Sequence, residues 1–182
     1  MKIQTLLLMI RNTLIMTLIF ASASVYATPL TFGFSFSNDG GTVDGTVSGR
    51  IFGLVDDLSG QSATKILIDS FPAGLGSDIN NGLDPILWDN VISNAFDVAH
   101  GVITYADFGA QDYTGTTDTF CINTNQTCVG VFGVLTFNGG TLRVENNQSP
   151  VLFTNITGVP EPSILALLSL GLVGIGFTRR KI

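Results

Sequence analysis

The stretch Leu30–Ser37 constrains the fold more than any other part of this 182-residue chain, because its apolar and polar residues alternate without exception. One face carries four large apolar side chains, those of Leu30, Phe32, Phe34 and Phe36. The other face carries only threonine, glycine and serine. Successive side chains of a β-strand point to opposite faces, so the stretch predicts a strand with one buried side. Four bulky apolar groups on one side need a facing sheet, which places this strand in a layered or closed β structure.

Short apolar groups elsewhere in the chain also predict strands. The expected strands are Thr42–Leu54, Ala63–Phe71, Phe96–Val98, Val102–Phe108, Cys128–Phe137, Thr141–Glu145 and Val151–Thr154. Glycine-containing turns should join neighbouring strands at Asn38–Gly41, Ala99–Gly101 and Asn138–Gly140. Between Thr28 and Val159 apolar residues nowhere recur at helical spacing for a dozen residues. The pattern predicts an all-β domain, either an antiparallel β-sandwich or an open barrel, of about eight short strands.

The first 27 residues have the composition of a secretory signal peptide. Basic residues precede the apolar run Leu14–Ala23, and small residues follow it. Valine and alanine stand third-last and last before Thr28, so cleavage is expected between Ala27 and Thr28. A start at Met9 instead of Met1 would give a more compact signal with the same cleavage point.

A second apolar run covers Ile164–Phe177. As a helix it would rise roughly 1.5 Å per residue to about 21 Å, short of the ~30 Å hydrocarbon core unless Pro162–Thr178 takes part. Backbone groups in lipid must be satisfied internally, so a transmembrane helix is the expected state, and its start, middle and end are Ile164, Leu170 and Phe177. A basic cluster that favours the cytoplasmic side follows, made of Arg179, Arg180 and Lys181. A buried C-terminal element of a soluble domain is the alternative.

The order of these C-terminal features resembles a known sorting signal. The apolar run is preceded by Val159, Pro160, Glu161 and Pro162. Together with the run and the basic cluster, they closely resemble the PEP-CTERM sorting signal of exported proteins in bacteria with an outer membrane. The resemblance implies processing by an exosortase-type membrane protease, a transient stay in the inner membrane, and delivery to the cell surface or beyond. The expected organisation is a signal peptide at 1–27, an exported β domain at 28–158 and the sorting signal at 159–182.

The exported part is strongly acidic. Between Thr28 and Val159 thirteen acidic residues outnumber three basic ones, Arg50, Lys65 and Arg143, which gives a net charge of about −10. Each contact with a nucleic-acid phosphate requires a cation, so this balance argues against nucleic acid or an anionic lipid surface as a partner. It is compatible with weak binding of divalent cations.

Cys121 and Cys128 are the two cysteines of the chain. In an exported chain, two cysteines separated by six residues predict one disulfide, worth roughly 2 to 3 kcal/mol in the chain-entropy model. A zinc site is not expected, because the spacing is wrong and the chain has a single histidine. The residues between the cysteines, Asn123–Gln126 among them, could present polar groups to a partner.

The expected surface loop, Ala73–Pro85, holds oxygen ligands of the kind that calcium prefers. They are Asp78, Asn80 and Asp84, and a similar group lies in Asp39–Asp44. Neither segment matches the twelve-residue EF-hand register, and Asp, Asn and Gly also serve turns for local reasons. Calcium is the one cofactor that the sequence leaves open, and no metal ligand is assigned.

Trp88, with Tyr105 and Tyr113, could form an aromatic platform for sugar rings, although a tryptophan in a β-sandwich is more often part of the core. His100 precedes a glycine in an expected turn, which favours a turn role over that of a catalytic base. The Gly-x-Ser-x-Gly motif of serine hydrolases is missing from the sequence. Glycosidase chemistry needs only two carboxylates, and the thirteen available leave that possibility open.

These observations predict an exported, non-enzymatic protein of the cell surface or extracellular matrix. The PEP-CTERM resemblance implies a structural or adhesive role in an exopolysaccharide or biofilm setting. A carbohydrate-binding module that uses Trp88 and the loop Ala73–Pro85 is the alternative, and a glycan-active hydrolase is a third hypothesis.

Overall fold

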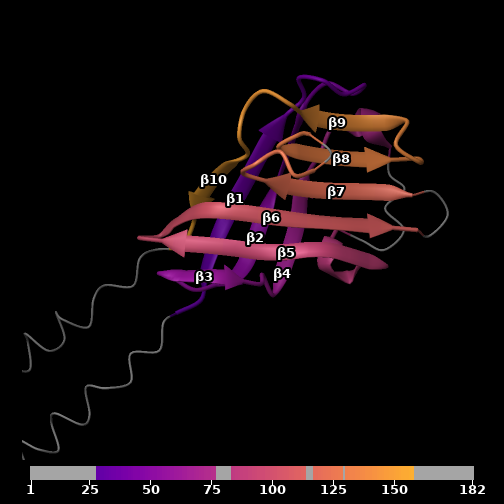
Figure 1. The fold of residues 1–182 in the computed structure, drawn as a ribbon. Coiled ribbons are helices and arrows are strands. Elements are labelled where there is room, and N and C mark those ends of the chain that lie inside the picture. The colour runs from indigo at the N-terminus through magenta and orange to yellow at the C-terminus, as the bar shows by residue number, and fades with distance from the viewer. Residues whose placement is uncertain (1–27, 77–82, 114–116, 129, 158–182) are drawn as a thin grey trace, which may run out of the picture. The chain divides into compact units, whose positions relative to one another are not determined.

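The computed structural model describes residues 28–76, 83–113, 117–128 and 130–157. These residues form two antiparallel β-sheets (Figure 1), which confirms the all-β class. The four-stranded sheet has the order β10-β1-β2-β4 and consists of β1 (Leu30–Ser37), β2 (Thr46–Leu54), β4 (Lys65–Ser70) and β10 (Leu152–Asn155). The six-stranded sheet has the order β3-β5-β6-β7-β8-β9 and consists of β3 (Leu58–Gln61), β5 (Asn90–Ala99), β6 (Val102–Asp112), β7 (Asp118–Asn123), β8 (Gly133–Phe137) and β9 (Leu142–Asn146).

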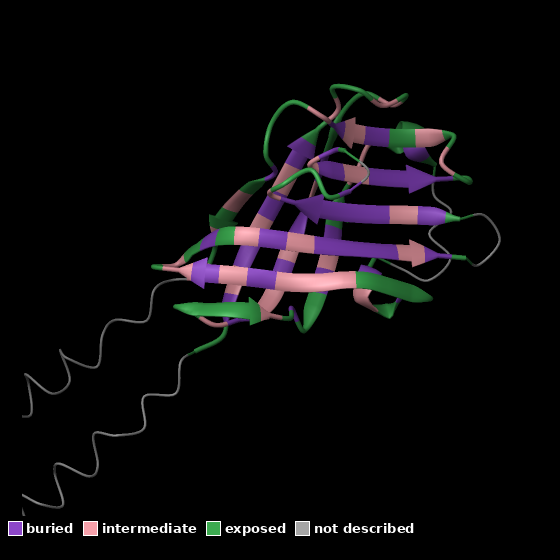
Figure 2. Ribbon diagram, viewed as in Figure 1, coloured by how far each residue is buried: buried purple, intermediate pink, exposed green. Residues whose placement is uncertain are grey.

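One hydrophobic core fills the space between the two sheets, as in a β-sandwich. The apolar face of β1 is buried as predicted, with at most 5 % of Leu30, Phe32, Phe34 and Phe36 exposed. Across the core, the ring of Phe34 lies 5.6 Å from that of Phe120 in β7. Buried and half-buried residues alternate along several strands (Figure 2). Since burying a phenylalanine contributes about 1.5–3 kcal/mol, this aromatic layer is a main source of stability.

The second strand begins at Thr46, four residues later than predicted. The preceding residues run along β9 instead, where the amides of Asp39 and Gly40 donate to the carbonyl of Glu145. The amide of Val43 donates to the carbonyl of Arg143, at 3.0 Å. This loop therefore covers the outer edge of β9, which would otherwise expose unpaired backbone groups.

The described residues contain ten strands rather than about eight, because the sequence prediction misses β3 and β7. β3 has four residues and no apolar alternation, and β7 begins with an aspartate, so neither carries the usual signal. β5 and β6 also extend beyond the predicted hairpin arms, to Asn90 and Asp112. The first residues of β5 are exposed, which conceals the strand in the sequence.

Two of the predicted turns are confirmed by their backbone angles. His100 and Gly101 have φ values of 53° and 72°, and Asn138, Gly139 and Gly140 have values of 54°, 66° and 82°. Positive φ is the conformation that glycine and asparagine tolerate best, which is why these residues mark hairpins in the sequence.

Two short 3₁₀ helices, η1 (Ala73–Leu75) and η2 (Pro85–Leu87), complete the described structure. Among the described residues, no helix has the length and apolar character needed to cross a bilayer. The predicted signal peptide, 1–27, and the predicted sorting segment, 159–182, lie outside the described residues.

Candidate functional site

A pocket of about 390 Å³ lies on the outer face of the six-stranded sheet, over β7, β8 and β9. Ligand sites typically occupy about 300–1,000 Å³, so the space suits a small ligand or one segment of a polymer. We call it the outer pocket; its strand residues are Thr119, Val134, Thr136, Arg143 and Glu145. Cys128 and the adjacent Val131 line it at the end of the disulfide loop, and Thr117, Gly139 and Gly140 complete its lining.

The pairing of three neighbouring strands builds the outer pocket. Thr119, Thr136 and Arg143 stand opposite one another across β7, β8 and β9. A second row consists of Cys121, Val134 and Glu145. The row between them, Phe120, Leu135 and Val144, points into the core and is fully buried. Successive side chains of a strand point to opposite faces of the sheet. Because the middle row is buried in the core, the two flanking rows must lie on the outer face.

An ion pair forms one side of the outer pocket. Arg143 Nε lies 3.2 Å from Glu145 Oε2, with the arginine side chain 44 % exposed and the glutamate 16 % exposed. The two charges cancel, so the outer pocket is close to neutral within a strongly acidic domain. Thr136 Oγ1 accepts a hydrogen bond from the amide of Thr119 at 3.0 Å, which ties β7 to β8 in the pocket floor.

The disulfide Cys121–Cys128 closes the loop beside the outer pocket, in agreement with the sequence prediction. The two cysteines and Val131 form a small apolar cluster on the outer face, with Val134 packed against it. One end of the pocket is therefore apolar, whereas threonine and charged side chains line the rest.

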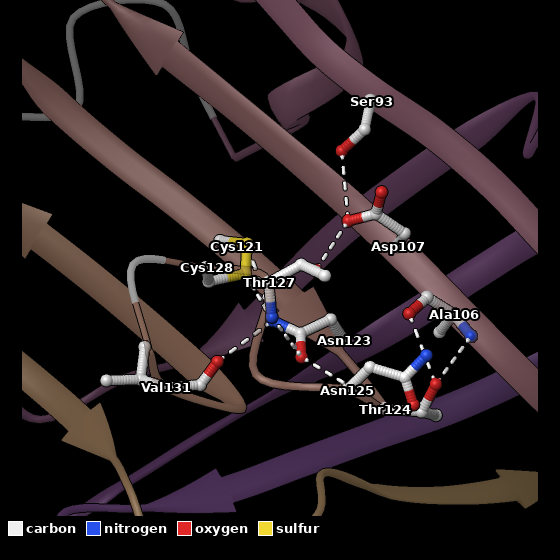
Figure 3. The surroundings of a disulfide bond; sticks show 10 residues. All are labelled: Ser93, Ala106, Asp107, Cys121, Asn123, Thr124, Asn125, Thr127, Cys128 and Val131. Carbon is white, nitrogen blue, oxygen red and sulfur yellow. Dashed lines mark hydrogen bonds between the residues drawn. A yellow bond between two sulfur atoms is a disulfide. The ribbon is translucent and has the colours of Figure 1, made fainter.

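Asn123 holds this loop in place (Figure 3). Its side chain is fully buried, and its Nδ2 donates to the carbonyl of Val131 at 3.0 Å. Its Oδ1 accepts from the amides of Asn125 and Thr127, at 3.0 and 3.3 Å. Thr127 Oγ1 in turn bonds Asp107 Oδ1 at 3.0 Å, which fastens the loop to β6. Asn123 is thus a structural centre of the loop, while Asn125 and Gln126 are exposed.

Comparison with known protein families finds a match at the C-terminal end of the chain. A family model described as the PEP-CTERM protein-sorting motif matches residues 158–181. The chain carries a PEP-CTERM sorting motif. No curated protein and no solved structure matches the chain.

The PEP-CTERM motif indicates that the protein is exported and that its C-terminus holds a membrane-anchoring sorting signal. The matched range includes the predicted sorting residues, namely Val159, Pro160, Glu161 and Pro162, the apolar run Ile164–Phe177, and the cluster Arg179, Arg180 and Lys181. The expected identity of this tail is thus confirmed at the level of the motif. The separate roles of these residues, and signal cleavage between Ala27 and Thr28, stay predictions.

The structure corrects the hypothesis that Trp88 offers a platform to sugar rings. Only 4 % of Trp88 is exposed, and the residue belongs to the core between the sheets. An indole in that position cannot stack on a ligand from solvent. Tyr113 is 53 % exposed, but its hydroxyl donates to Gln111 Oε1 at 2.6 Å. The aromatic surface that the carbohydrate-binding alternative requires is therefore not formed around Trp88.

The described carboxylates among the calcium candidates accept hydrogen bonds from backbone amides. Asp84 Oδ1 accepts from the amides of Ile66 and Ile86, at 3.3 and 3.2 Å, so it caps η2 and fastens it to β4. Asp78 and Asn80 lie outside the described residues. Both carboxylate oxygens of Asp39 accept backbone amides, from Asn147 and Gln148. The part of the chain that the structure describes holds no group of three or more metal-ligating side chains.

The catalytic alternatives find little support in the geometry. The His100 side chain is 92 % exposed, and its Nδ1 lies 3.4 Å from Asp57 Oδ1 at the tip of the β5–β6 hairpin. Asp112 and Asp118 face each other across β6 and β7, but each is only 1 % exposed, so a substrate cannot reach this carboxylate pair.

Apart from the disulfide residue Cys128, the sequence does not predict the residues of the outer pocket. In the sequence Arg143 stands out only as one of three basic residues of the exported part, and Thr119 lies in a strand that the sequence does not reveal. One signal in the sequence is usable: residues alternate in character along Val134–Phe137 and Leu142–Glu145, on either side of a glycine turn. In a hairpin with this turn, Thr136 and Arg143 lie opposite each other on the same face.

Proposed function

We propose that this protein is delivered to the cell surface or extracellular matrix, where its β domain serves a structural or adhesive role without catalysis. The PEP-CTERM motif at residues 158–181 carries the proposal, because it marks a chain that is exported and sorted through its tail. A compact domain with buried aromatic residues and an internal disulfide suits such a destination.

The sorting tail is handled by an exosortase-type membrane protease. The apolar segment holds the precursor briefly in the inner membrane, and proteolysis then releases the β domain. Intact-mass spectrometry of protein recovered from the medium should show a C-terminus close to Val159 or Pro160. Recovery of a product that still ends in residues 179–182 would refute removal of the tail.

The adhesive or structural role concerns exopolysaccharide or biofilm material outside the cell. Two features support it: the acidic domain disfavours nucleic acid and anionic lipid, and the facing carboxylates of Asp112 and Asp118 are buried. Deletion of the gene should weaken matrix formation or adhesion and leave growth on soluble sugars unchanged. Normal adhesion together with a lost hydrolase activity would contradict the adhesive role and favour the hydrolase hypothesis.

A further inference from the structure

We propose that the outer pocket binds an uncharged saccharide segment and is the adhesive surface of the domain. This inference rests on the proposed extracellular role but places the contact at a specific site. It replaces Trp88 as the candidate sugar contact, because that indole lies in the core.

The charge of the outer pocket selects a neutral ligand. Arg143 and Glu145 neutralise each other at 3.2 Å, so a charged ligand gains an attraction from one of them and a repulsion from the other. A polyanion is further disfavoured by the net charge of about −10 between Thr28 and Val159. A wholly apolar ligand would leave the charged and hydroxyl groups of the pocket without solvent or partners.

The hydrogen-bonding groups of the pocket fit a polyhydroxylated ligand. The Arg143 guanidinium presents donors in a planar fork, and the Glu145 carboxylate presents acceptors beside it. The hydroxyls of Thr117 and Thr119 can act as either donor or acceptor. A sugar hydroxyl also donates and accepts, so it can bond to both members of the ion pair at once.

The apolar end of the pocket fits the other surface of a sugar ring. Val131 and Val134 lie beside the Cys121–Cys128 disulfide and form a small apolar patch. The C–H face of a pyranose can cover this patch while its hydroxyls reach the polar side. Apolar and polar walls within about 390 Å³ therefore match the two faces of a saccharide unit.

The pocket is also held rigidly before a ligand arrives. Its side chains stand on paired strands, and its apolar end is fixed by the disulfide and by Asn123. A preformed site avoids the entropic cost of ordering loops on binding.

The test uses the exported protein purified from the producing culture. The probe is the polysaccharide of the same culture, separated on an anion exchanger into a neutral and an acidic fraction and immobilised for surface plasmon resonance. We expect saturable binding to the neutral fraction and at least tenfold weaker binding to the acidic one. Preference for the acidic fraction, or no binding to either, would overturn the inference.

The paired variant Arg143→Ala/Glu145→Ala should weaken binding to the neutral fraction at least tenfold. Its matched control is Arg50→Ala/Asp69→Ala, which removes an ion pair with a similarly exposed arginine from the outer face of the other sheet and should leave binding unchanged. Equal effects of both pairs would show non-specific adsorption and overturn the site.

A second variant guards against a folding defect in the first. Val134 is half-buried and points into the pocket, so Val134→Phe fills the space without entering the core. It should abolish binding while circular dichroism stays unchanged; full binding by this variant would exclude the outer pocket. Secretion of all variants is followed in parallel: a protein retained in the cytosol contradicts the proposed function, whereas a secreted protein without sugar binding contradicts only this inference.

Discussion

Asn123→Ala tests whether one buried amide organises the disulfide loop. The substitution removes a donor to the Val131 carbonyl and an acceptor for the amides of Asn125 and Thr127. A net contribution of roughly 0.5–1.5 kcal/mol for each of the three hydrogen bonds predicts a loss of about 1.5 to 4.5 kcal/mol in the free energy of unfolding. The fully buried position of Asn123 argues for the upper part of that range, because water cannot replace the lost partners.

The disulfide gives a scale for this loss. Cys121 and Cys128 close a loop of eight residues, which corresponds to about 2.5 kcal/mol in the chain-entropy model. The two devices act on the same segment, so their effects should not add. With both cysteines replaced by alanine, the cost of Asn123→Ala should fall by about 1 kcal/mol. Without the disulfide the loop is partly open, so the hydrogen bonds of Asn123 are formed less of the time.

Urea unfolding of the exported protein, followed by circular dichroism, measures these differences through the transition midpoint. Asn125→Ala is the matched control, because Asn125 is the same residue type in the same loop but is exposed, and its replacement should change stability by less than about 0.5 kcal/mol. If Asn123→Ala and Asn125→Ala shifted the midpoint equally, the amide would not be the organiser of the loop.

Three further predictions follow from the packing and the covered edges. Trp88→Ala should lower the free energy of unfolding by about 3 to 5 kcal/mol, because the indole is 4 % exposed in the core. An unchanged urea midpoint would contradict the burial of Trp88. Gly133→Ala should cost about 1 to 3 kcal/mol by the same measurement, since an added Cβ would lie 2.8 Å from the ring of Phe36, and a neutral effect would contradict this close approach. Asp39→Ala should speed hydrogen exchange at the amide of Asn147, which its carboxylate accepts at 2.6 Å; unchanged exchange there would argue against the loop as a cover for β9.

The parts of the fold that the sequence predicts are those with local signals. β1 matches its predicted bounds because four apolar residues alternate with small polar ones, and nothing in that strand competes with the pattern. The turns at His100 and Asn138 match because positive φ restricts the residue types that a tight hairpin accepts. The disulfide is predictable because an exported chain reaches an oxidising environment, and its two closely spaced cysteines can pair only with each other.

The outer pocket could not be predicted in the same way, because its geometry depends on register across three strands. Thr119, Thr136 and Arg143 come from separate stretches and meet only when β7, β8 and β9 pair as they do. β7 itself carries a weak signal, since it starts with Asp118 and ends with Asn123, both of them buried. Polar residues that a fold buries for local reasons conceal the alternation on which a sequence prediction depends.

The loop residues show why oxygen-rich segments mislead a search for metal sites. Asp39 and Asp84 both resemble ligands in the sequence, yet each of them accepts hydrogen bonds from two backbone amides. An amide that leaves a strand or begins a helical turn must find an acceptor, and a short Asp or Asn side chain is the nearest one. Side-chain oxygen serves a backbone amide as readily as a cation, so composition alone cannot separate the two uses. The deciding observation is whether the surrounding amides already bond the side-chain oxygens, as they do at both carboxylate oxygens of Asp39 and at Oδ1 of Asp84.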